Sequence, residues 1–378
     1  MRTASLSHAL SGLCAALACA AAGLLTPFCP ALAADRATDA PAAAAAAAAA
    51  PAEAGRLVYE ARFMGLSMGT IVSARLYSED EKTAARLADL FEKKTADYET
   101  LFTVHGEGPL NEVNRRSGSW VSVDCRLAAL VQAAKDVARS SNRAFEPTIG
   151  TLVNVWKIGF GGDRHPPRAD IEAALKKVDY TQIAVDETPG ACRVKIGAGQ
   201  SIDLGAIAKG WIGTALARDM QRAGARHGII DLGGNVSLIG SSPSGEPWRV
   251  GIQRPDAERN TVMAVVQAEN VSVITSGAYE RKIEADGRTY GHILSAVTGE
   301  PVGTDLASVT IVNPDGARAD GWCTALFAMG SEKALESAAR EGLSVILASG
   351  DLKTLWVSRA IADRVTVQDK SMKIEIVP

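Results

Sequence analysis

The stretch that decides the fold spans residues 272–330 and contains TSGAYER (275–281), GHILSAVTGEP (291–301), LASVTIVNP (306–314) and ADGWCTALFAMG (319–330). These blocks combine short β-forming runs with residues that can contact a phosphorylated ligand. Asp320 and Thr324 are four residues apart, so a helix places both side chains on one face. A carboxylate and a hydroxyl in that arrangement can serve as oxygen ligands for a hard cation such as Mg²⁺.

The same stretch places further chemistry at the ends of expected strands. His292 and the turn Thr275-Ser276-Gly277 follow β-forming runs, and loops at strand ends commonly carry functional side chains. Structural roles are the alternatives: Asp320 as an N-cap, Thr324 as a core-facing hydroxyl, and His292 as a buried structural histidine. The combined pattern indicates metal-assisted handling of a phosphate ester.

Apolar spacing upstream of this stretch predicts helices at 80–102, 127–140 and 209–224, the first with Asp80 as its N-cap. Further helices are expected from Ala319 and from Ser331. Strands are expected at 57–63, 70–77, 228–232, 248–253, 262–268, 271–275 and 307–313, and near residues 345, 355, 365 and 374. Both element types are plentiful and strict βαβ alternation is missing. This favours an α+β fold with mixed or antiparallel sheets and packed helices.

The glycine-rich segment at 197–210 is not one of the common nucleotide motifs. GAGQSI does not complete G-x-G-x-x-G, and AIAKGW has lysine before glycine rather than G-K-[ST]. Lys209 stands where a helix begins, a position that favours phosphate. A solvated lysine at a helix start is the alternative.

The first 33 residues have the features of a secretory signal peptide. Arg2 gives a positive start, residues 10–25 are mainly apolar, and Ala31-Leu32-Ala33 offers a cleavage site. A membrane anchor would need a longer run. A lipoprotein signal is disfavoured because neither Cys19 nor Cys29 lies in a good lipobox. Residues 34–55 are rich in Ala and Pro and predict a flexible linker.

Residues 56–378 are long enough for one large domain or two closely joined lobes. The formal net charge of −3 and the lack of basic runs argue against a nucleic-acid partner. Cys125, Cys192 and Cys323 are scattered beyond the leader, so at most one pair could form a disulfide after export. A small buried hydrophobe is the default interpretation of each.

Seven segments, in order, resemble motifs of the ApbE family, the FAD:protein FMN transferases. That family has Met-Gly-Thr, Ala-Phe-Asp-Pro-Thr-Val-Gly, Asp-Leu-Gly-Gly-Ile-Ala-Lys-Gly, a strand ending in Gly-Gly, Thr-Ser-Gly, His-Ile-Ile-Asp-Pro-x-Thr-Gly and Ala-Asp-Ala-x-x-Thr. The segments here are MGT (68–70), AFEPTIGTLVNVW (144–156), IDLGAIAKGW (202–211), IIDLGGN (229–235), TSGAYER (275–281), HILSAVTG (292–299) and ADGWCT (319–324). The resemblance implies an ApbE-like, T-fold-like architecture.

The resemblance also implies a Mg²⁺ site and an FAD site. The Mg²⁺ ligands would be Asp320, Thr324 and the backbone carbonyl of Ala206, which does not depend on the side chain. His292 could take the proton of an acceptor hydroxyl. The residues that would line the FAD site are Met68, His105, Ala144, Phe145, Glu146, Asp203, Lys209, Thr275 and Leu294.

Two segments depart from the family pattern. FTVHGEGPLNEVN (102–114) keeps only Leu110 and Asn114 of a region in which the family has an aromatic residue, aligned with His105 or Val104. Ser295-Ala296 replaces the Asp-Pro that follows His-Ile-Ile, so His292 lacks a neighbouring carboxylate unless Asp286 or Glu300 supplies one. These changes bear on acceptor choice and rate more than on flavin binding.

The resemblance implies Mg²⁺-dependent transfer of FMN from FAD to a Thr or Ser hydroxyl of an acceptor protein, with release of AMP. The acceptor would carry a D-x-[ST]-G-A-[ST] type motif and could bring the enzyme close to a membrane. We expect an exported protein, in the periplasm or on the outer face of the cytoplasmic membrane, without a lipid anchor. The alternatives are a Mg²⁺-dependent FAD pyrophosphatase and a non-catalytic flavin-binding protein.

Overall fold

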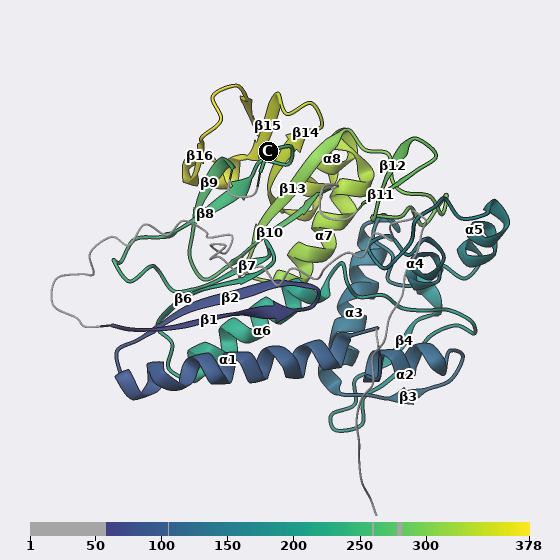
Figure 1. The fold of residues 1–378 in the computed structure, drawn as a ribbon, viewed down its shortest axis with the longest axis horizontal. Helices are drawn as coiled ribbons and strands as arrows, with labels where there is room; N and C mark the ends of the chain where they lie inside the picture. Colours follow the sequence, from purple (N-terminus) through teal and green to yellow (C-terminus); the bar gives the residue numbers. More distant parts are fainter. Residues whose placement is uncertain (1–57, 105, 259–260, 278–281) are drawn as a thin grey trace, which may run out of the picture. The chain divides into compact units, whose positions relative to one another are not determined.

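The computed structural model describes residues 58–104, 106–258, 261–277 and 282–378. These residues form a mixed α+β domain, which confirms the expected fold class (Figure 1). The predicted leader, the predicted linker and His105 lie outside the described residues. Within the described part of the chain, no helix is long and apolar enough to cross a membrane.

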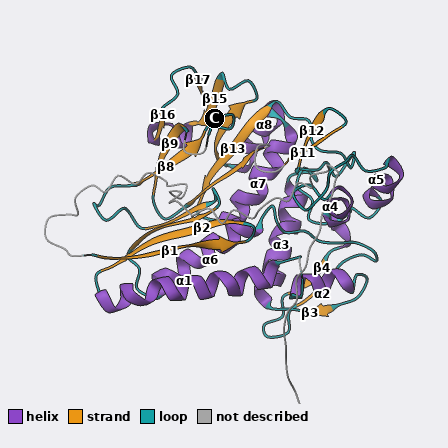
Figure 2. Ribbon diagram, in the orientation of Figure 1, coloured by secondary structure: helices purple, strands orange, loops and turns teal. Residues whose placement is uncertain are grey.

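A nine-stranded sheet forms the centre of the domain (Figure 2). In spatial order its strands are β1 (Tyr59–Ser67), β2 (Thr70–Ser78), β6 (His227–Leu232), β7 (Val236–Ile239), β10 (Ser272–Gly277), β13 (Leu306–Asn313), β14 (Ser344–Ser349), β15 (Thr354–Ser358) and β17 (Lys373–Val377). Neighbouring strands are antiparallel except β15 and β17, which are parallel. The sheet is therefore mixed, as the sequence predicts.

Three smaller sheets surround it. The first contains β16 (Val365–Val367), β9 (Val262–Ala268) and β8 (Trp248–Gln253), the second β3 (Val121–Ser122), β5 (Arg193–Lys195) and β4 (Ala184–Asp186), and the third β11 (Lys282–Ala285) and β12 (Arg288–Gly291). Their pairings are all antiparallel. The β11–β12 hairpin ends one residue before His292, so it places that residue at a strand end.

The α-helices are α1 (Glu81–Phe102), α2 (Pro109–Arg115), α3 (Cys125–Ser140), α4 (Gly150–Trp156), α5 (Arg168–Leu175), α6 (Ala208–Arg222), α7 (Gly316–Met329) and α8 (Ser331–Glu341). Two 3₁₀ turns, η1 (Tyr180–Gln182) and η2 (Arg359–Arg364), complete the secondary structure of the described residues. The long helices match the expected ones. We did not predict α2, α4 and α5, because a run of seven or eight residues covers only about two helical turns.

Two apolar cores lie on the two faces of the nine-stranded sheet. On one face α1, α6 and α7 bury residues such as Phe91, Leu216 and Trp322. On the other face the β16-β9-β8 sheet buries Trp248 and Val266. This layering explains why a central strand such as β7 is buried on both faces, with all four of its residues buried.

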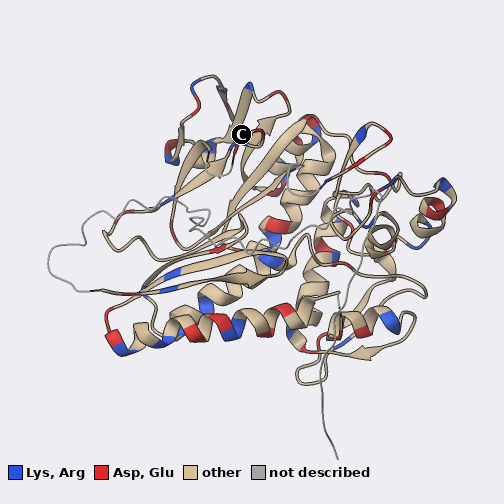
Figure 3. Cartoon of the chain, in the orientation of Figure 1, with Lys and Arg blue, Asp and Glu red and all other residues tan. Residues whose placement is uncertain are grey.

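The first helix forms for reasons visible in its sequence. Asp80 accepts a hydrogen bond from the Thr83 N–H at 2.7 Å and so caps the helix, as expected. Leu87, Phe91 and Tyr98 are buried at helical spacing against the sheet. The outer side carries acidic and basic residues in alternation (Figure 3). An amphipathic helix of this kind covers a sheet edge and leaves a solvated face of mixed charge.

Two expectations need correction. Helix α7 begins at Gly316 with Asp315 as its N-cap, rather than at Ala319, so Asp320 lies inside the helix and not at its start. Cys125 and Cys192 form a disulfide, with their Cα atoms 5.1 Å apart. The default interpretation of a small buried hydrophobe therefore holds only for Cys323, which keeps a buried thiol.

Candidate functional site

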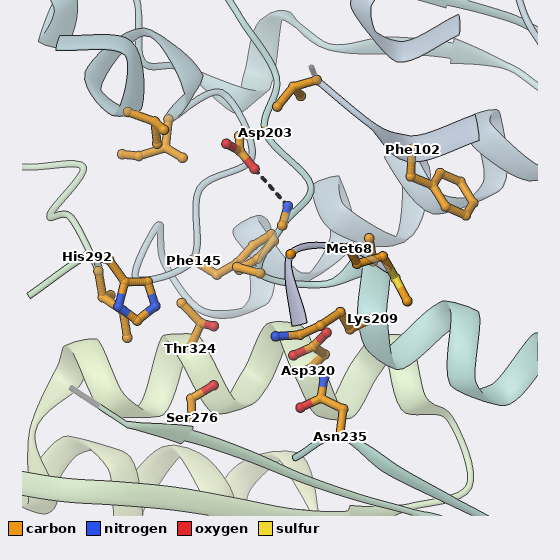
Figure 4. A pocket seen from close by; sticks show the side chains of 18 of the residues that line it. Met68, Phe102, Phe145, Asp203, Lys209, Asn235, Ser276, His292, Asp320 and Thr324 are labelled. Carbon is orange, nitrogen blue, oxygen red and sulfur yellow. Dashed lines mark hydrogen bonds between the residues drawn. The ribbon is translucent and has the colours of Figure 1, made fainter. Parts of the chain in front are cut away.

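A cavity of about 410 Å³ lies where the β1–β2 turn, the start of α6, the end of β10 and the middle of α7 meet (Figure 4). Every predicted site residue within the described part of the chain lines it. The predicted residues are Met68, Ala144, Phe145, Glu146, Asp203, Ala206, Lys209, Thr275, His292, Leu294, Asp320 and Thr324. Segments separated by more than two hundred residues thus contribute to one site.

Asp320 is a buried acidic group of the cavity. Its side chain is in α7, the residue is 4% exposed, and Oδ2 accepts a hydrogen bond from the Gly210 N–H at 2.8 Å. Burial raises the pKa of Asp320 above its usual value, although Lys209, the Gly210 N–H and the nearby Asn235 side chain oppose this rise. A carboxylate in such a position gains from a cation placed beside it.

Glycines bring the Asp320 carboxylate to the start of α6. Helices α6 and α7 cross where Gly210 faces Gly316, and a Cβ atom at either position would clash with the backbone carbonyl of the other. Because the two backbones can approach closely, the Asp320 side chain reaches the first turn of α6. The Lys209 ammonium lies beside it in the cavity (Figure 4).

The predicted metal ligands fit a hard cation. Thr324 lies one turn after Asp320 on α7, and its hydroxyl has no hydrogen-bond partner among the described residues. The Gly210 N–H, four residues after Ala206, donates to Asp320 and not to the Ala206 carbonyl. That carbonyl therefore accepts no backbone hydrogen bond from the described chain and is left for a ligand. Carboxylate, hydroxyl and carbonyl oxygens suit Mg²⁺, which binds proteins through one or two carboxylates and takes other ligands from water and substrate phosphates. The residues present therefore fit the ion.

Asn235 is a site residue that the sequence analysis missed. It follows β6 in the IIDLGGN segment and is 4% exposed; its buried Nδ2 lies near enough to Asp320 to lower the pKa of that carboxyl, but it makes no hydrogen bond of normal geometry with the described residues. Figure 4 shows its amide next to Asp320 at the cavity floor. A buried donor without a partner costs free energy unless a ligand or water accepts from it, so Asn235 can donate to an anionic oxygen bound here.

Three other predicted residues form the walls. Phe145 is 2% exposed, so it contributes an apolar surface rather than a mobile ring. The Asp203 carboxylate accepts a hydrogen bond from the Gly205 N–H at 2.7 Å, which orders the turn that leads to Ala206 (Figure 4). Met68 lies in the β1–β2 turn. Met68 and Phe145 thus give the cavity apolar surface and Asp203 adds a carboxylate, a combination common in small-molecule sites.

The Glu146 side chain is bound within its own part of the fold. Its side chain is almost fully buried and accepts hydrogen bonds from the Thr148 N–H at 3.1 Å and the Thr148 hydroxyl at 2.8 Å. A third bond comes from the Tyr180 N–H at 3.3 Å. The carboxylate thus fixes the 145–149 loop, and a contact of Glu146 with FAD stays a prediction.

Thr275 and Leu294 contribute less specific surface. The Thr275 hydroxyl shares a hydrogen bond with that of Thr310 across the β10–β13 pair, at 2.8 Å. Ser276, one residue further on, points into the cavity in Figure 4. Ser276 lies in the Thr-Ser-Gly motif noted in the sequence, which forms the last three residues of β10 and not the expected turn. Leu294 is 9% exposed and adds an apolar contact.

The loop after His292 is held by hydrogen bonds between its own residues. The Ser295 hydroxyl accepts hydrogen bonds from the Val297 and Thr298 N–H groups, each at 3.2 Å. Glu300, one of the two carboxylates considered for His292, lies 3.0 Å from His165 Nε2 through its Oε2. A carboxylate at position 295 would accept the same turn bonds.

A model of the ApbE family matches residues 68–347. The chain belongs to the ApbE family. A protein of Klebsiella pneumoniae named FAD:protein FMN transferase is 35% identical over 274 residues, which is 72% of this chain and 83% of that protein. A protein of Salmonella typhimurium with the same name is 33% identical over 304 residues, 78% of this chain and 86% of that protein.

The fold agrees with this assignment. The crystal structure of the ApbE protein of Thermotoga maritima superposes with a TM-score of 0.73 at 29% identity. The superposition covers 82% of this chain and 99% of that one. The resemblance inferred from the sequence and the ApbE-like architecture are therefore both confirmed.

Proposed function

We propose that this protein transfers FMN from FAD to a Thr or Ser hydroxyl of an acceptor protein, with Mg²⁺ bound and AMP released. The observation that carries the proposal is the convergence of Asp320, Thr324 and the Ala206 carbonyl with Lys209 in one cavity. The names of the relatives with 35% and 33% identity support the same activity.

The protein's own groups suggest how the reaction proceeds. Asp203, Lys209 and Asn235 would hold FAD, with its pyrophosphate at the polar floor and its rings against Met68 and Phe145. Asp320, Thr324 and the Ala206 carbonyl would hold Mg²⁺, which supplies charge neutralisation at the pyrophosphate when bound.

The transfer forms one bond and breaks another. The acceptor oxygen bonds to the phosphorus that carries riboflavin, and the bond from that phosphorus to the oxygen bridging to AMP breaks. AMP leaves with that bridging oxygen. His292, which lines the cavity, would accept the proton of the attacking hydroxyl. In the rival pyrophosphatase reaction, water replaces the acceptor hydroxyl and the products are FMN and AMP.

We also propose that the protein acts outside the cytoplasm on an acceptor with a D-x-[ST]-G-A-[ST] motif. The Cys125–Cys192 disulfide supports export, because such bonds persist in oxidising compartments. The signal-like residues 1–33 support it independently. The acceptor would bring the enzyme near a membrane only through its own attachment.

The experiment compares two acceptors that differ at one residue. Purified protein, FAD and Mg²⁺ are mixed with a peptide carrying the acceptor motif, or with a peptide whose final Thr is Ala. AMP and flavin fluorescence on the peptide are measured, with Asp320→Asn as a matched inactive variant. Transfer predicts AMP and labelled peptide only with the Thr peptide. AMP without any acceptor would identify a pyrophosphatase, and bound FAD without AMP a binding protein.

A further inference from the structure

A second cavity, of about 540 Å³, adjoins the FAD cavity and has no role in the function proposed above. It lies between α2, α4 and the segment 199–203, and we call it the side cleft. Val104, Val153, Phe160 and Asp203 line both cavities, so the two share a wall. The other lining residues are Asn111, Asn114, Arg115, Gly150, Thr151, Asn154, Lys157, Gly199, Ser201 and Ile202.

Both walls of the side cleft form hydrogen bonds with the segment 199–203. The Asn114 side chain on α2 accepts from the Ile202 N–H at 2.7 Å and donates to the Ile202 carbonyl at 2.9 Å. On the opposite side the Gly150 N–H donates to the Ser201 carbonyl at 3.1 Å, and a Cβ atom at Gly150 would clash with that carbonyl. Segment 199–203 therefore fixes both walls and continues through Asp203 to Ala206 at the metal site.

Several polar groups in the side cleft are not used by the fold. The side chains of Asn154, Lys157 and Ser201 make no hydrogen bond or ion pair with other described residues. Arg115, by contrast, pairs with Glu112 on its own helix. Lys157 is therefore the cation of this cleft that has no acidic partner within the described chain.

The local backbone presents Lys157 at the cleft. Lys157 is the C-cap of α4 and has a left-handed backbone with φ of 51°. Residues other than Gly and Asn rarely adopt this conformation. Its N–H donates to the Val153 carbonyl at 2.8 Å, and its carbonyl accepts from the N–H groups of Phe160 and Gly162. This strained but well-bonded turn also carries Phe160, which is 44% exposed on the shared wall.

We propose that the side cleft binds the acceptor polypeptide and that Lys157 pairs with a carboxylate of the acceptor. The inference rests on the proposed transfer reaction, in which a protein hydroxyl must enter the FAD cavity from outside. Binding energy for such a substrate comes from contacts remote from the reacting atom. Asn154 and Ser201 offer hydrogen bonds for an extended backbone, and Lys157 offers charge complementarity.

The test is a charge-pair cycle on acceptor recognition. Lys157→Ala and the unaltered protein are each assayed with the peptide of the acceptor motif and with the same peptide carrying Asn in place of its Asp. We expect Lys157→Ala to raise the KM for the Asp peptide about fivefold, as for one exposed charge pair, and to leave the KM for the Asn peptide unchanged. Lys333→Ala, an exposed lysine on α8, is the matched control.

The Kd for FAD, measured by calorimetry, shows whether the side cleft binds the acceptor or part of the dinucleotide. Weaker FAD binding by Lys157→Ala would mean that the side cleft holds part of FAD, and would overturn the inference. An equal loss with both peptides would overturn the carboxylate pairing. If the unaltered protein labels no peptide, the proposed function fails instead, and that result is distinct because it does not involve Lys157.

Discussion

Glu99 on α1 holds Met68 in place at the edge of the FAD cavity. Its Oε1 accepts from the Met68 N–H at 2.8 Å, and its Oε2 accepts from the Ser67 hydroxyl at 2.6 Å. Met68 has a φ of 53° and Gly69 a φ of 70°, so both turn residues are left-handed, as in a type I′ hairpin. Hydrogen bonds to a carboxylate stabilise this turn against the cost of the Met68 conformation.

The first prediction concerns this contact. Glu99→Ala removes both acceptors, so the turn loosens and FAD binding should weaken about tenfold, which corresponds to about 1.4 kcal/mol. Glu99→Gln keeps one acceptor oxygen and should show a smaller loss. The measurement is FAD titration by calorimetry, with exposed Glu92→Gln on the same helix as the control. Unchanged FAD affinity in Glu99→Ala would show that the turn is held by other contacts.

Asp320→Asn separates folding from metal binding. The raised pKa of Asp320 means that the folded state disfavours its charged form, so the stability of the unaltered protein falls as pH rises through that pKa. Without Mg²⁺, Asp320→Asn should therefore have the higher Tm at neutral pH, and the difference should shrink as pH falls. Mg²⁺ should raise the Tm of the unaltered protein only.

Turnover supplies the second measurement for the same variant. Replacing a ligand should reduce Mg²⁺-dependent AMP release by more than about 100-fold, since even residues that merely orient ligands contribute tenfold to 100-fold. Thr324→Val should cause a smaller loss, because water can replace one hydroxyl. Full Mg²⁺-dependent activity in Asp320→Asn would contradict the assignment.

Ser295 tests the loop after His292. Ser295→Ala removes the acceptor for the Val297 and Thr298 N–H groups and should slow transfer several-fold, with little change in FAD affinity. Ser295→Asp keeps an acceptor and should restore the rate at least to that of the unaltered protein. His292→Ala in either background should remove transfer. Equal rates for Ser295→Ala and the unaltered protein would show that this turn does not position the loop.

The disulfide predicts a redox dependence of stability. Cys125 and Cys192 are 67 residues apart, so the chain-entropy relation gives about 4 kcal/mol for the closed loop. The Cys125→Ser, Cys192→Ser double variant should lose stability of that order in urea unfolding, and its Tm should not respond to dithiothreitol. The unaltered protein should lose stability in dithiothreitol. A Tm of the unaltered protein that is insensitive to reduction would contradict this.

The last prediction is that Glu60 stabilises the fold in a pH-dependent way. Burial would raise the pKa of Glu60, but hydrogen bonds from Arg62, Arg75 and Tyr77 outweigh it and lower the pKa to about 2. A lowered folded pKa stabilises the fold above the ordinary value of 4.5, and this contribution is lost as pH falls towards 2. Glu60→Gln should thus lower Tm at pH 6 and have little effect near pH 2. A Tm difference independent of pH would exclude this mechanism.

Most of the helices and strands that were predicted correctly follow from patterns within a few neighbouring residues. The β8 and β9 strands match their predicted bounds, and α1 begins after its predicted cap, Asp80. Such features depend on alternation, helical spacing and capping within a few residues. The short helices α2 and α4 escaped prediction because tertiary contacts, such as the Asn114 bonds to Ile202, stabilise them more than their own sequence does.

By itself, the sequence determined the family, the α+β class and the set of chemical groups, because ordered motifs such as IDLGAIAKGW and ADGWCT are local and long. Only the tertiary structure decided which groups face one cavity and what each carboxylate does. The Glu146 carboxylate accepts a hydrogen bond from the Thr148 hydroxyl, and the buried Asp320 carboxylate accepts one from the Gly210 N–H. The Glu99 carboxylate accepts one from the Met68 N–H, 31 residues away. Hydrogen bonds between residues far apart in the chain produce no periodic pattern in the sequence. Which residues pair is therefore decided by how the helices and the sheet pack.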